Sequence, residues 1–319
     1  MLICMSIVIL IGVIQHIFSE RQRSSLRANE MRGLTIGVVL VAPPGAEVEA
    51  RVTALLHAAA RPECIRFYVA KLCESTNDVP SLSNARVRVC TRMHYVRASR
   101  NSAPRLRARL IHEVLEQYVL CLGWNHEAEM GWDETLINLH GACPKQRSVL
   151  LTTRLAPTEK GVTFLAVSEF GTNRMRLSSY AFAVPPKRAT PTLAMSAQVA
   201  FAETQTVRGA WVDADVFTGK GIDEDATLTT ILWMAGVDFF TPQHSPFVLS
   251  TGAAECTDTE GRFVWGKAHV TRSRAELLTT LGIRNGKATS RARAGLTQGA
   301  TAQERFDKLG QAFRMRRDI

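Results

Sequence analysis

Short apolar runs and longer stretches of helical periodicity alternate along the first half of the chain. Residues 34–41, 65–69 and 118–122 are mainly apolar, and each has the length of a buried strand. Apolar residues recur at helical spacing over residues 46–60 and from Pro104 to Tyr118. Two further runs of strand length are residues 87–90 and 148–152. This alternation predicts an α/β fold in which helices flank a mostly parallel central sheet.

The amino terminus has a different pattern. Residues 1–18 contain no charged side chain and are almost entirely apolar. That length is close to the minimum for a membrane-spanning helix, for which about 20 residues are typical. A basic linker over residues 19–33 follows, and no small-residue cleavage site separates the two segments. We therefore expect residues 1–18 to form one apolar helix that anchors the protein in a membrane; a short helix buried against protein is the alternative.

The sequence leaves open the side of the membrane on which the rest of the chain lies. The positive-inside rule places the Arg-rich linker, and with it the bulk of the chain, on the cytoplasmic face. An enzyme in the lumen of the Golgi or another secretory compartment would need the opposite orientation.

The remainder divides into a domain and a tail. Residues 34–270 are expected to form one domain, because no internal repeat and no linker rich in Gly, Ser or Pro divides them. Residues 271–319 form a basic tail, in which Thr301 and Glu304 have the spacing of a capping box. Apolar side chains share one face of the helix that this box would open. We therefore expect the tail to pack on the domain.

Composition and charge narrow the choice of partners. Hydrophobic residues make up 46% and charged residues 21% of the chain, which are values typical of a globular protein. Lys and Arg number 39 against 29 Asp and Glu, and the formal net charge of +10 favours anionic partners such as phosphate-bearing ligands. A nucleic-acid partner is not favoured, because aromatic side chains are not interleaved with the basic ones. The 7 cysteines include no C-x-x-C pair, so zinc and redox motifs of that spacing have no support.

Clusters of charge mark the candidate binding residues. Between Pro80 and His112 there are eight arginines and no acid. Guanidinium groups bind a diphosphate by paired hydrogen bonds; the alternative is a solvated basic face. Polar residues 124–127 follow the strand 118–122, and the acidic cluster 221–225 precedes a helix, where the helix dipole also favours acids. Because ligands of open α/β sheets bind beyond the carboxyl ends of the strands, we expect both segments to line one cleft.

Several segments, in order along the chain, resemble one known family. They are Ala108-Arg109 with the strand 118–122 and Gly131-Trp-Asp-Glu134, a loose match over residues 170–177, Asp223-Glu-Asp225 with the stretch to Pro242, and Leu281-Gly-Ile283 with residues 295–299. Together they resemble the GlcNAc-transferase family, which adds N-acetylglucosamine to protein hydroxyls from UDP-GlcNAc. The resemblance implies a single domain of the GT-A type, UDP-GlcNAc as donor and a protein acceptor. It also implies a divalent metal ion, Mn²⁺ or Mg²⁺, on the UDP pyrophosphate.

The chain departs from the family at the metal ligands. The family's Asp-x-His falls on Gly123-Trp-Asn125, and the place of its later metal-binding His reads Phe247-Val-Leu-Ser250. His126 and Glu127 could rebuild a metal site; the alternative is an ordinary polar loop. We therefore expect weak or absent dependence on a metal ion.

Two functions remain open: an active glycosyltransferase, and a non-catalytic member of the same fold that serves as a scaffold or complex subunit. In the active enzyme, Glu224 or Asp225 would orient or deprotonate the acceptor hydroxyl. The residues expected to hold the donor are Arg105, Arg107, Arg109 and Asn125, and the candidate metal ligands are His126 and Glu127.

Overall fold

The computed structural model describes most of the chain between residues 33 and 250. The described residues are 33–74, 82–97, 102–143, 149–153, 163–170, 174–181, 186–192, 194–208, 217 and 222–250, together with the backbone of three short strands beyond them. The backbone divides into two units, Met1–Leu34 and Thr35–Ile319, and the features below belong to the second. The predicted anchor over residues 1–18, all but the last residue of the linker, and the helix predicted after Thr301 lie outside the described residues.

The second unit is built on one large sheet with smaller sheets beside it. The large sheet has eight strands in the order β3-β2-β1-β4-β10-β6-β11-β9. In chain order its strands are β1 (Ile36–Ala42), β2 (Ile65–Cys73), β3 (Thr91–Arg97), β4 (Tyr118–Leu122), β6 (Val149–Thr152), β9 (Thr190–Thr192), β10 (Val199–Glu203) and β11 (Asp238–Thr241). One smaller sheet pairs β5 (His126–Ala128) with β12 (Phe247–Leu249). A second has three strands, β7 (Thr163–Phe170), β8 (Arg174–Ala181) and β13 (Thr259–Arg262). A third pairs β14 (Ile283–Arg284) with β15 (Lys287–Ala288).

Most strands of the large sheet run in the same direction. β1 pairs in parallel with β2 and β4, β2 with β3, and β6 with β11. β10 is antiparallel to both β4 and β6, and β9 is antiparallel to β11, so only these two strands are reversed. The fold is therefore mixed α/β with a mostly parallel central sheet, as the alternating pattern predicted. The carboxyl ends of the parallel strands meet at one edge, which we call the carboxyl edge.

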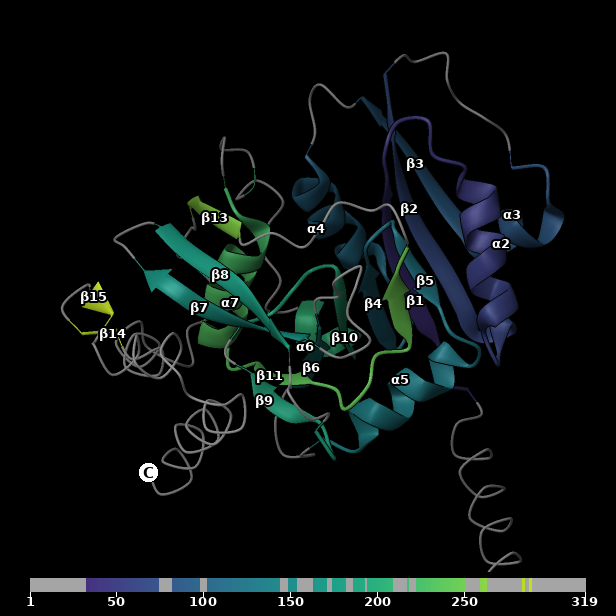
Figure 1. Cartoon of the computed structure of the whole chain (residues 1–319). Helices are drawn as coiled ribbons and strands as arrows, with labels where there is room; N and C mark the ends of the chain where they lie inside the picture. Colours follow the sequence, from purple (N-terminus) through teal and green to yellow (C-terminus); the bar gives the residue numbers. More distant parts are fainter. Residues whose placement is uncertain are drawn as a thin grey trace, which may run out of the picture. The chain divides into compact units, whose positions relative to one another are not determined.

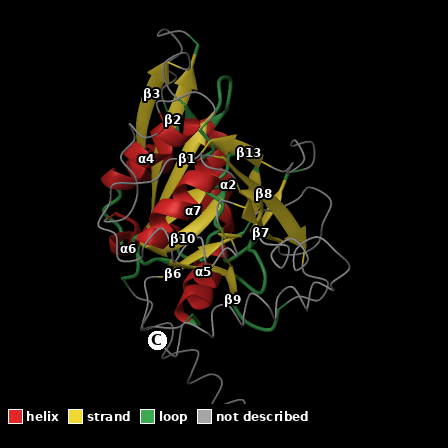
Figure 2. Cartoon of the chain, turned by 90° about the vertical axis from the view of Figure 1, so that its left-hand side faces the viewer, coloured by secondary structure: helices red, strands yellow, loops and turns green. Residues whose placement is uncertain are grey.

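Helices cover both faces of this sheet. They are α2 (Val48–Ala58), α3 (Ala85–Cys90), α4 (Ala103–Glu113), α5 (Trp132–Gly141), α6 (Thr204–Arg208) and α7 (Glu224–Met234). Figure 1 shows α4 and α7 on one side of the sheet, and α2 and α3 on the other. Figure 2 views the sheet from the side of α4 and α7. The buried side chains of α4 and α7 form one core with alternate residues of the strands, such as Cys121 of β4 and Ala200 of β10. Alternation within each strand therefore supplies apolar side chains to both helical layers.

The segment that resembles the family's Gly-Trp-Asp-Glu motif joins α5 to α2. Gly131 adopts a φ of 74°, a left-handed conformation that suits glycine, and opens α5. Trp132 is fully buried and donates from Nε1 to the carbonyl of Leu55 at 3.0 Å. The carboxylate of Asp133 accepts from the backbone amides of Ala60 at 2.7 Å and Arg61 at 2.9 Å, just after α2 ends. In this structure the motif therefore holds two helices together.

Two sequence predictions need correction. Residues 87–90 were predicted as a strand, but they belong to helix α3. The Asn84 side chain caps that helix by accepting from the amides of Arg86 and Val87, and β3 begins only at Thr91. A four-residue run is too short for its periodicity to separate helix from strand. The helix predicted from Pro104 to Tyr118 ends earlier, at Glu113, because the chain must extend before it enters β4.

Within the part of the chain that the structure describes, no helix is both long enough and apolar enough to cross a membrane.

The contact between Asp133 and the end of α2 yields a prediction about stability. The Asp133→Ala variant should lose about 2 kcal/mol of unfolding free energy, because two amides that are partly buried lose their acceptor. Asp133→Asn should lose less, since one acceptor oxygen remains. Urea unfolding followed by circular dichroism measures both values. An Asp133→Ala variant as stable as the parent chain would show that this contact does not hold the helices together.

Candidate functional site

The candidate site begins where β4 ends at the carboxyl edge. The backbone amide of Gly123 donates to the carbonyl of Gln198, the residue that precedes β10, at 2.6 Å. A side chain at position 123 would have its Cβ only 2.5 Å from Nδ1 and 2.6 Å from Cε1 of His126. The imidazole of His126 therefore occupies the space into which a side chain at position 123 would project.

His126 is a buried imidazole. The residue is 2% exposed, and neither ring nitrogen has a hydrogen-bond partner among the described residues. Burial, reinforced by the charges of Arg51 and Arg107, lowers its pKa to about 4, although the backbone contact with Gly123 opposes the shift. His126 is therefore neutral at physiological pH, and it can offer one donor and one acceptor to a neighbouring group.

A buried ion pair lies close to His126. Arg107 of α4 donates from Nη1 to Oε2 of Glu224, the first residue of α7, and the two side chains are 9% and 14% exposed. Burial alone would lower the pKa of Arg107, but the attraction of Glu224 and the hydrogen bond to it raise the pKa above its ordinary value. The same environment raises the pKa of the Cys121 thiol to about 12, mainly through burial. Cys121 is therefore a neutral core residue and not a reactive thiolate.

The start of α7 is fixed at the same edge by its acidic residues. Asp223 caps the helix by accepting from the amide of Ala226 at 2.7 Å. Oδ1 of Asp225 accepts from the amide of Ala197 at 2.8 Å, and Ala197 leads into β10 beside the end of β4. The acidic cluster and the segment after β4 thus share one anchor, the loop before β10. Both segments therefore lie at one edge of the sheet, and the cleft that the sequence predicts between them stays a prediction.

The structure brings some of the predicted site residues together and leaves others apart. Arg107, Glu224, Asp225 and His126 are buried or nearly buried at the carboxyl edge, and Arg107 interacts electrostatically with the other three. Asn125 is exposed, and its backbone carbonyl accepts from the amide of Ser250. The remaining predicted residues have more open positions: Arg105 is half-buried, and Arg109 and Glu127 are exposed.

The described residues do not fit a divalent metal ion. Neighbouring positions in a strand face opposite ways, and accordingly His126 is buried while Glu127 is exposed. Gly123 offers no side chain. Among the described residues, no three His, Cys, Asp or Glu side chains are grouped closely enough to hold one ion. A metal site at His126 and Glu127 stays a prediction that this geometry does not favour.

Arg51 is a buried cation at this edge that the sequence pattern did not predict. Its Nε and Nη2 atoms are buried without a hydrogen-bond partner among the described residues. Burial lowers its pKa to about 10, although the charge of Glu127 opposes the shift, so Arg51 remains a cation at physiological pH. One signal for it was available: Arg51 lies in the first turn of the helix that follows the first strand, where α/β folds often bind phosphate groups.

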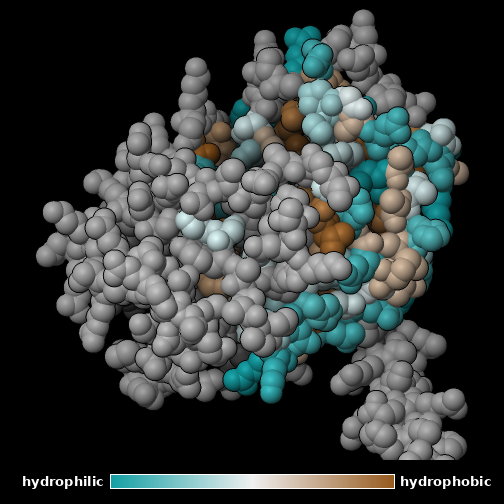
Figure 3. Space-filling model, viewed as in Figure 1, coloured by the Kyte–Doolittle hydropathy of each residue, from teal (hydrophilic) through white to brown (hydrophobic). Residues whose placement is uncertain are grey.

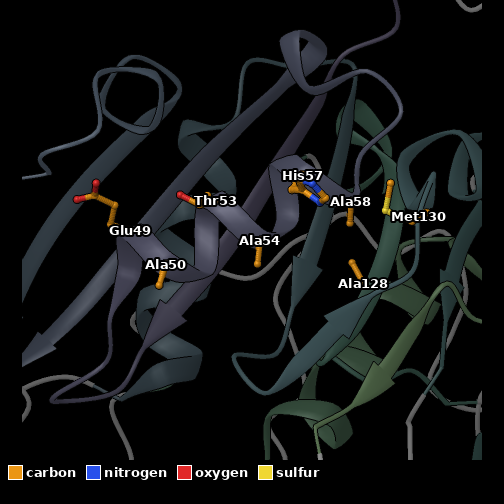
Figure 4. Close-up of a pocket in the computed structure, with 8 residues that line it drawn as sticks. All are labelled: Glu49, Ala50, Thr53, Ala54, His57, Ala58, Ala128 and Met130. Atoms are coloured by element: carbon orange, nitrogen blue, oxygen red, sulfur yellow. The ribbon is translucent and has the colours of Figure 1, made fainter.

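Two hollows border this region. A pocket of about 270 Å³ lies at the carboxyl ends of β1, β2 and β3, between the first turn of α2 and strand residues such as Lys71 and Tyr95. An open groove of about 840 Å³ runs along α2, where Ala54 and Ala58 face Ala128 and Met130 (Figure 4). Met130 is 72% exposed, and hydrophobic side chains reach the surface among hydrophilic ones on the face drawn in Figure 3.

Comparisons with known proteins indicate a family. A family model described as Glycosyltransferase (GlcNAc) matches residues 8–273. GalNAc-T7, solved with UDP, GalNAc and Mn²⁺, has a similar fold: the TM-score is 0.53 at 11% identity, over 78% of this chain and 47% of that one. The chain thus spans about half the length of GalNAc-T7. Residues 1–349 of S. aureus TarS overlay with a TM-score of 0.44 at 12% identity, over 88% of this chain and 80% of that one. No match was found among curated proteins.

The buried ion pair yields a second prediction about stability. Arg107→Met and Glu224→Gln should each lower the free energy of unfolding by about 3–5 kcal/mol, because either change leaves one buried charge without its partner. The double variant should recover much of that loss. Arg92→Met is the control, because its pair with Glu113 is on the surface and should be worth less than about 1 kcal/mol. Urea unfolding of all variants tests this; losses that simply add in the double variant would contradict it.

Proposed function

The chain belongs to the GlcNAc glycosyltransferase family, and on this premise we propose that it transfers N-acetylglucosamine from UDP-GlcNAc to a hydroxyl of a protein. The observation that carries this proposal is the cluster of buried charged and polar side chains at the carboxyl edge, built from Arg107, His126, Glu224 and Asp225. In open α/β sheets, this edge is where ligands bind.

The order of the strands supports a path for the donor along this edge. The pocket at the carboxyl ends of β1, β2 and β3 has room for part of a nucleoside, and its lining includes Lys71 and Tyr95 as well as Glu47 and Glu49. The first turn of α2 borders this pocket, and the end of β4 with His126 comes next in the sheet. The nucleoside would occupy the pocket, the diphosphate would lie near the α2 turn and His126, and the sugar would point toward the start of α7.

Two carboxylates are available for the acceptor. In an active enzyme, Glu224 or Asp225 would accept the proton of the attacking hydroxyl or orient that hydroxyl. Asp225 is held in place by the amide of Ala197, and Glu224 by Arg107. Both carboxylates are thus fixed before any substrate binds, which favours a defined geometry for attack.

One observation favours the alternative, a family member that keeps the fold without the reaction. Glu224 is paired with a buried guanidinium, and such a pair can serve as a purely structural contact. A protein of this kind would act as a scaffold or complex subunit, with or without nucleotide binding.

Transfer activity separates these two functions. We expect UDP-GlcNAc to bind the full chain in calorimetry, and sugar transfer to a peptide library to be detected by mass spectrometry. Glu224→Gln or Asp225→Asn should lower transfer by about 10²-fold, the usual scale for losing a positioned acid or base. Because Glu224→Gln is expected to destabilise the fold, transfer is measured where circular dichroism shows the variant to be folded. Glu203→Gln is the control, because Glu203 is exposed at the other end of β4 and should leave transfer unchanged.

Binding of UDP-GlcNAc without any transfer would support the non-catalytic alternative. Full transfer by both Glu224→Gln and Asp225→Asn would remove these residues from the mechanism. No binding of UDP-GlcNAc by the full chain would contradict the proposed function itself.

A further inference from the structure

Several buried polar atoms at the carboxyl edge have no partner among the described residues. They are both ring nitrogens of His126, Nε and Nη2 of Arg51, Nε of Arg107 and Oε1 of Glu224. Folded proteins leave few buried polar groups unpaired, because each costs free energy when it is removed from water without a new hydrogen bond. Donors outnumber acceptors in this group, so the ligand that would satisfy it is rich in acceptor oxygens.

The two arginines differ in how their charges are balanced. The charge of Arg107 is matched by the direct ion pair with Glu224. Arg51 has a coulombic interaction with Glu127, and Glu127 is an exposed residue. Of these two arginines, Arg51 therefore has the charge and the donors that are less satisfied within the described residues.

The geometry around Gly123 disfavours a metal ion at the same place. The His126 ring occupies the space of a side chain at position 123, at Cβ distances of 2.5 and 2.6 Å, so an acidic ligand there would displace the imidazole. Two guanidinium groups are close enough to act on His126 electrostatically, and both would repel a metal cation bound to that ring. An anion, in contrast, would be attracted by both.

We propose that Arg51 holds the diphosphate of the nucleotide donor through its guanidinium group, in the place that a divalent metal ion takes in the family pattern. His126 adds one hydrogen bond to the same group. This inference rests on the proposed function and names the residue that neutralises the donor. α2 packs against β5, the strand that carries His126, and Arg51 of α2 acts on the His126 ring electrostatically. The pocket beyond β1, β2 and β3 borders that same turn and takes the nucleoside.

The role of Arg51 follows from the charges in the reaction. The acceptor oxygen forms a bond to the anomeric carbon, and its proton passes to Glu224 or Asp225. The bond from that carbon to the diphosphate oxygen breaks, and its electron pair leaves with the diphosphate. Negative charge therefore builds on the diphosphate, where a fixed guanidinium stabilises it.

Calorimetry with UDP as the probe tests this assignment in the full chain. In buffer containing EDTA, UDP should bind the parent chain, and added Mn²⁺ should change its Kd by less than about twofold. Arg51→Met should weaken binding by about tenfold or more, the scale of a lost hydrogen bond to a charged group. The Kd of Arg51→Lys for UDP should lie between those of the parent chain and Arg51→Met, because lysine keeps the charge but cannot form the paired hydrogen bonds. Arg66→Met is the matched control: Arg66 is exposed near the amino end of β2, away from the carboxyl edge.

The outcomes separate this inference from the proposed function. Binding of UDP that is unchanged in Arg51→Met and Arg51→Lys would overturn the role of Arg51 and leave donor binding intact. Binding by the parent chain only when Mn²⁺ is present would also overturn it. No binding of UDP under either condition would overturn the proposed function and this inference together. Circular dichroism shows whether each variant is folded. If Arg51→Met does not fold, UDP binding by Arg51→Lys tests the role of Arg51.

Discussion

A guanidinium group and a carboxylate are buried together where α4 meets α7, and much of the site depends on this pair. Removing two charges from water is costly unless they meet each other directly, so Arg107 and Glu224 constrain the positions of both helices. Because Glu224 is the first residue of α7, the pair also fixes where that helix starts. The adjacent Asp225 is then in place to bind the loop that leads into β10. One charged contact thus positions the acidic cluster at the carboxyl edge.

The same edge differs from the family pattern in its side chains while the fold is kept. The position that resembles a metal-binding acid is Gly123, and the His126 imidazole fills the space beside it. The nearby cations are Arg107, matched by Glu224, and Arg51, which forms no direct ion pair with the residues that the structure describes. Guanidinium groups therefore carry positive charge at this edge, and the diphosphate of the proposed donor would be complementary to it.

The sequence predicted the strands of the central sheet better than it predicted individual side-chain contacts. Fully buried strands such as β1 and β4 are unbroken apolar runs, and such runs are readable without tertiary information. Residues 87–90 were predicted as a strand, but they are helical. The helix is too short for its hydrophobic pattern to show the helical period, and the side-chain cap from Asn84 helps to fix it. The pairing of Arg107 with Glu224 joins residues 117 positions apart, and no local pattern reveals it. Arg51 lies outside the Arg-rich stretch, so no cluster of charge in the sequence marks it.

A crystal structure of the full chain with bound UDP would test the central claim most directly, because it locates both phosphorus atoms relative to the side chains of the carboxyl edge. The account predicts the diphosphate within hydrogen-bond distance of the Arg51 guanidinium and the His126 ring, with the nucleoside in the pocket beyond β1, β2 and β3. A diphosphate bound away from this edge, or one that leaves Arg51 without a phosphate contact, would contradict it.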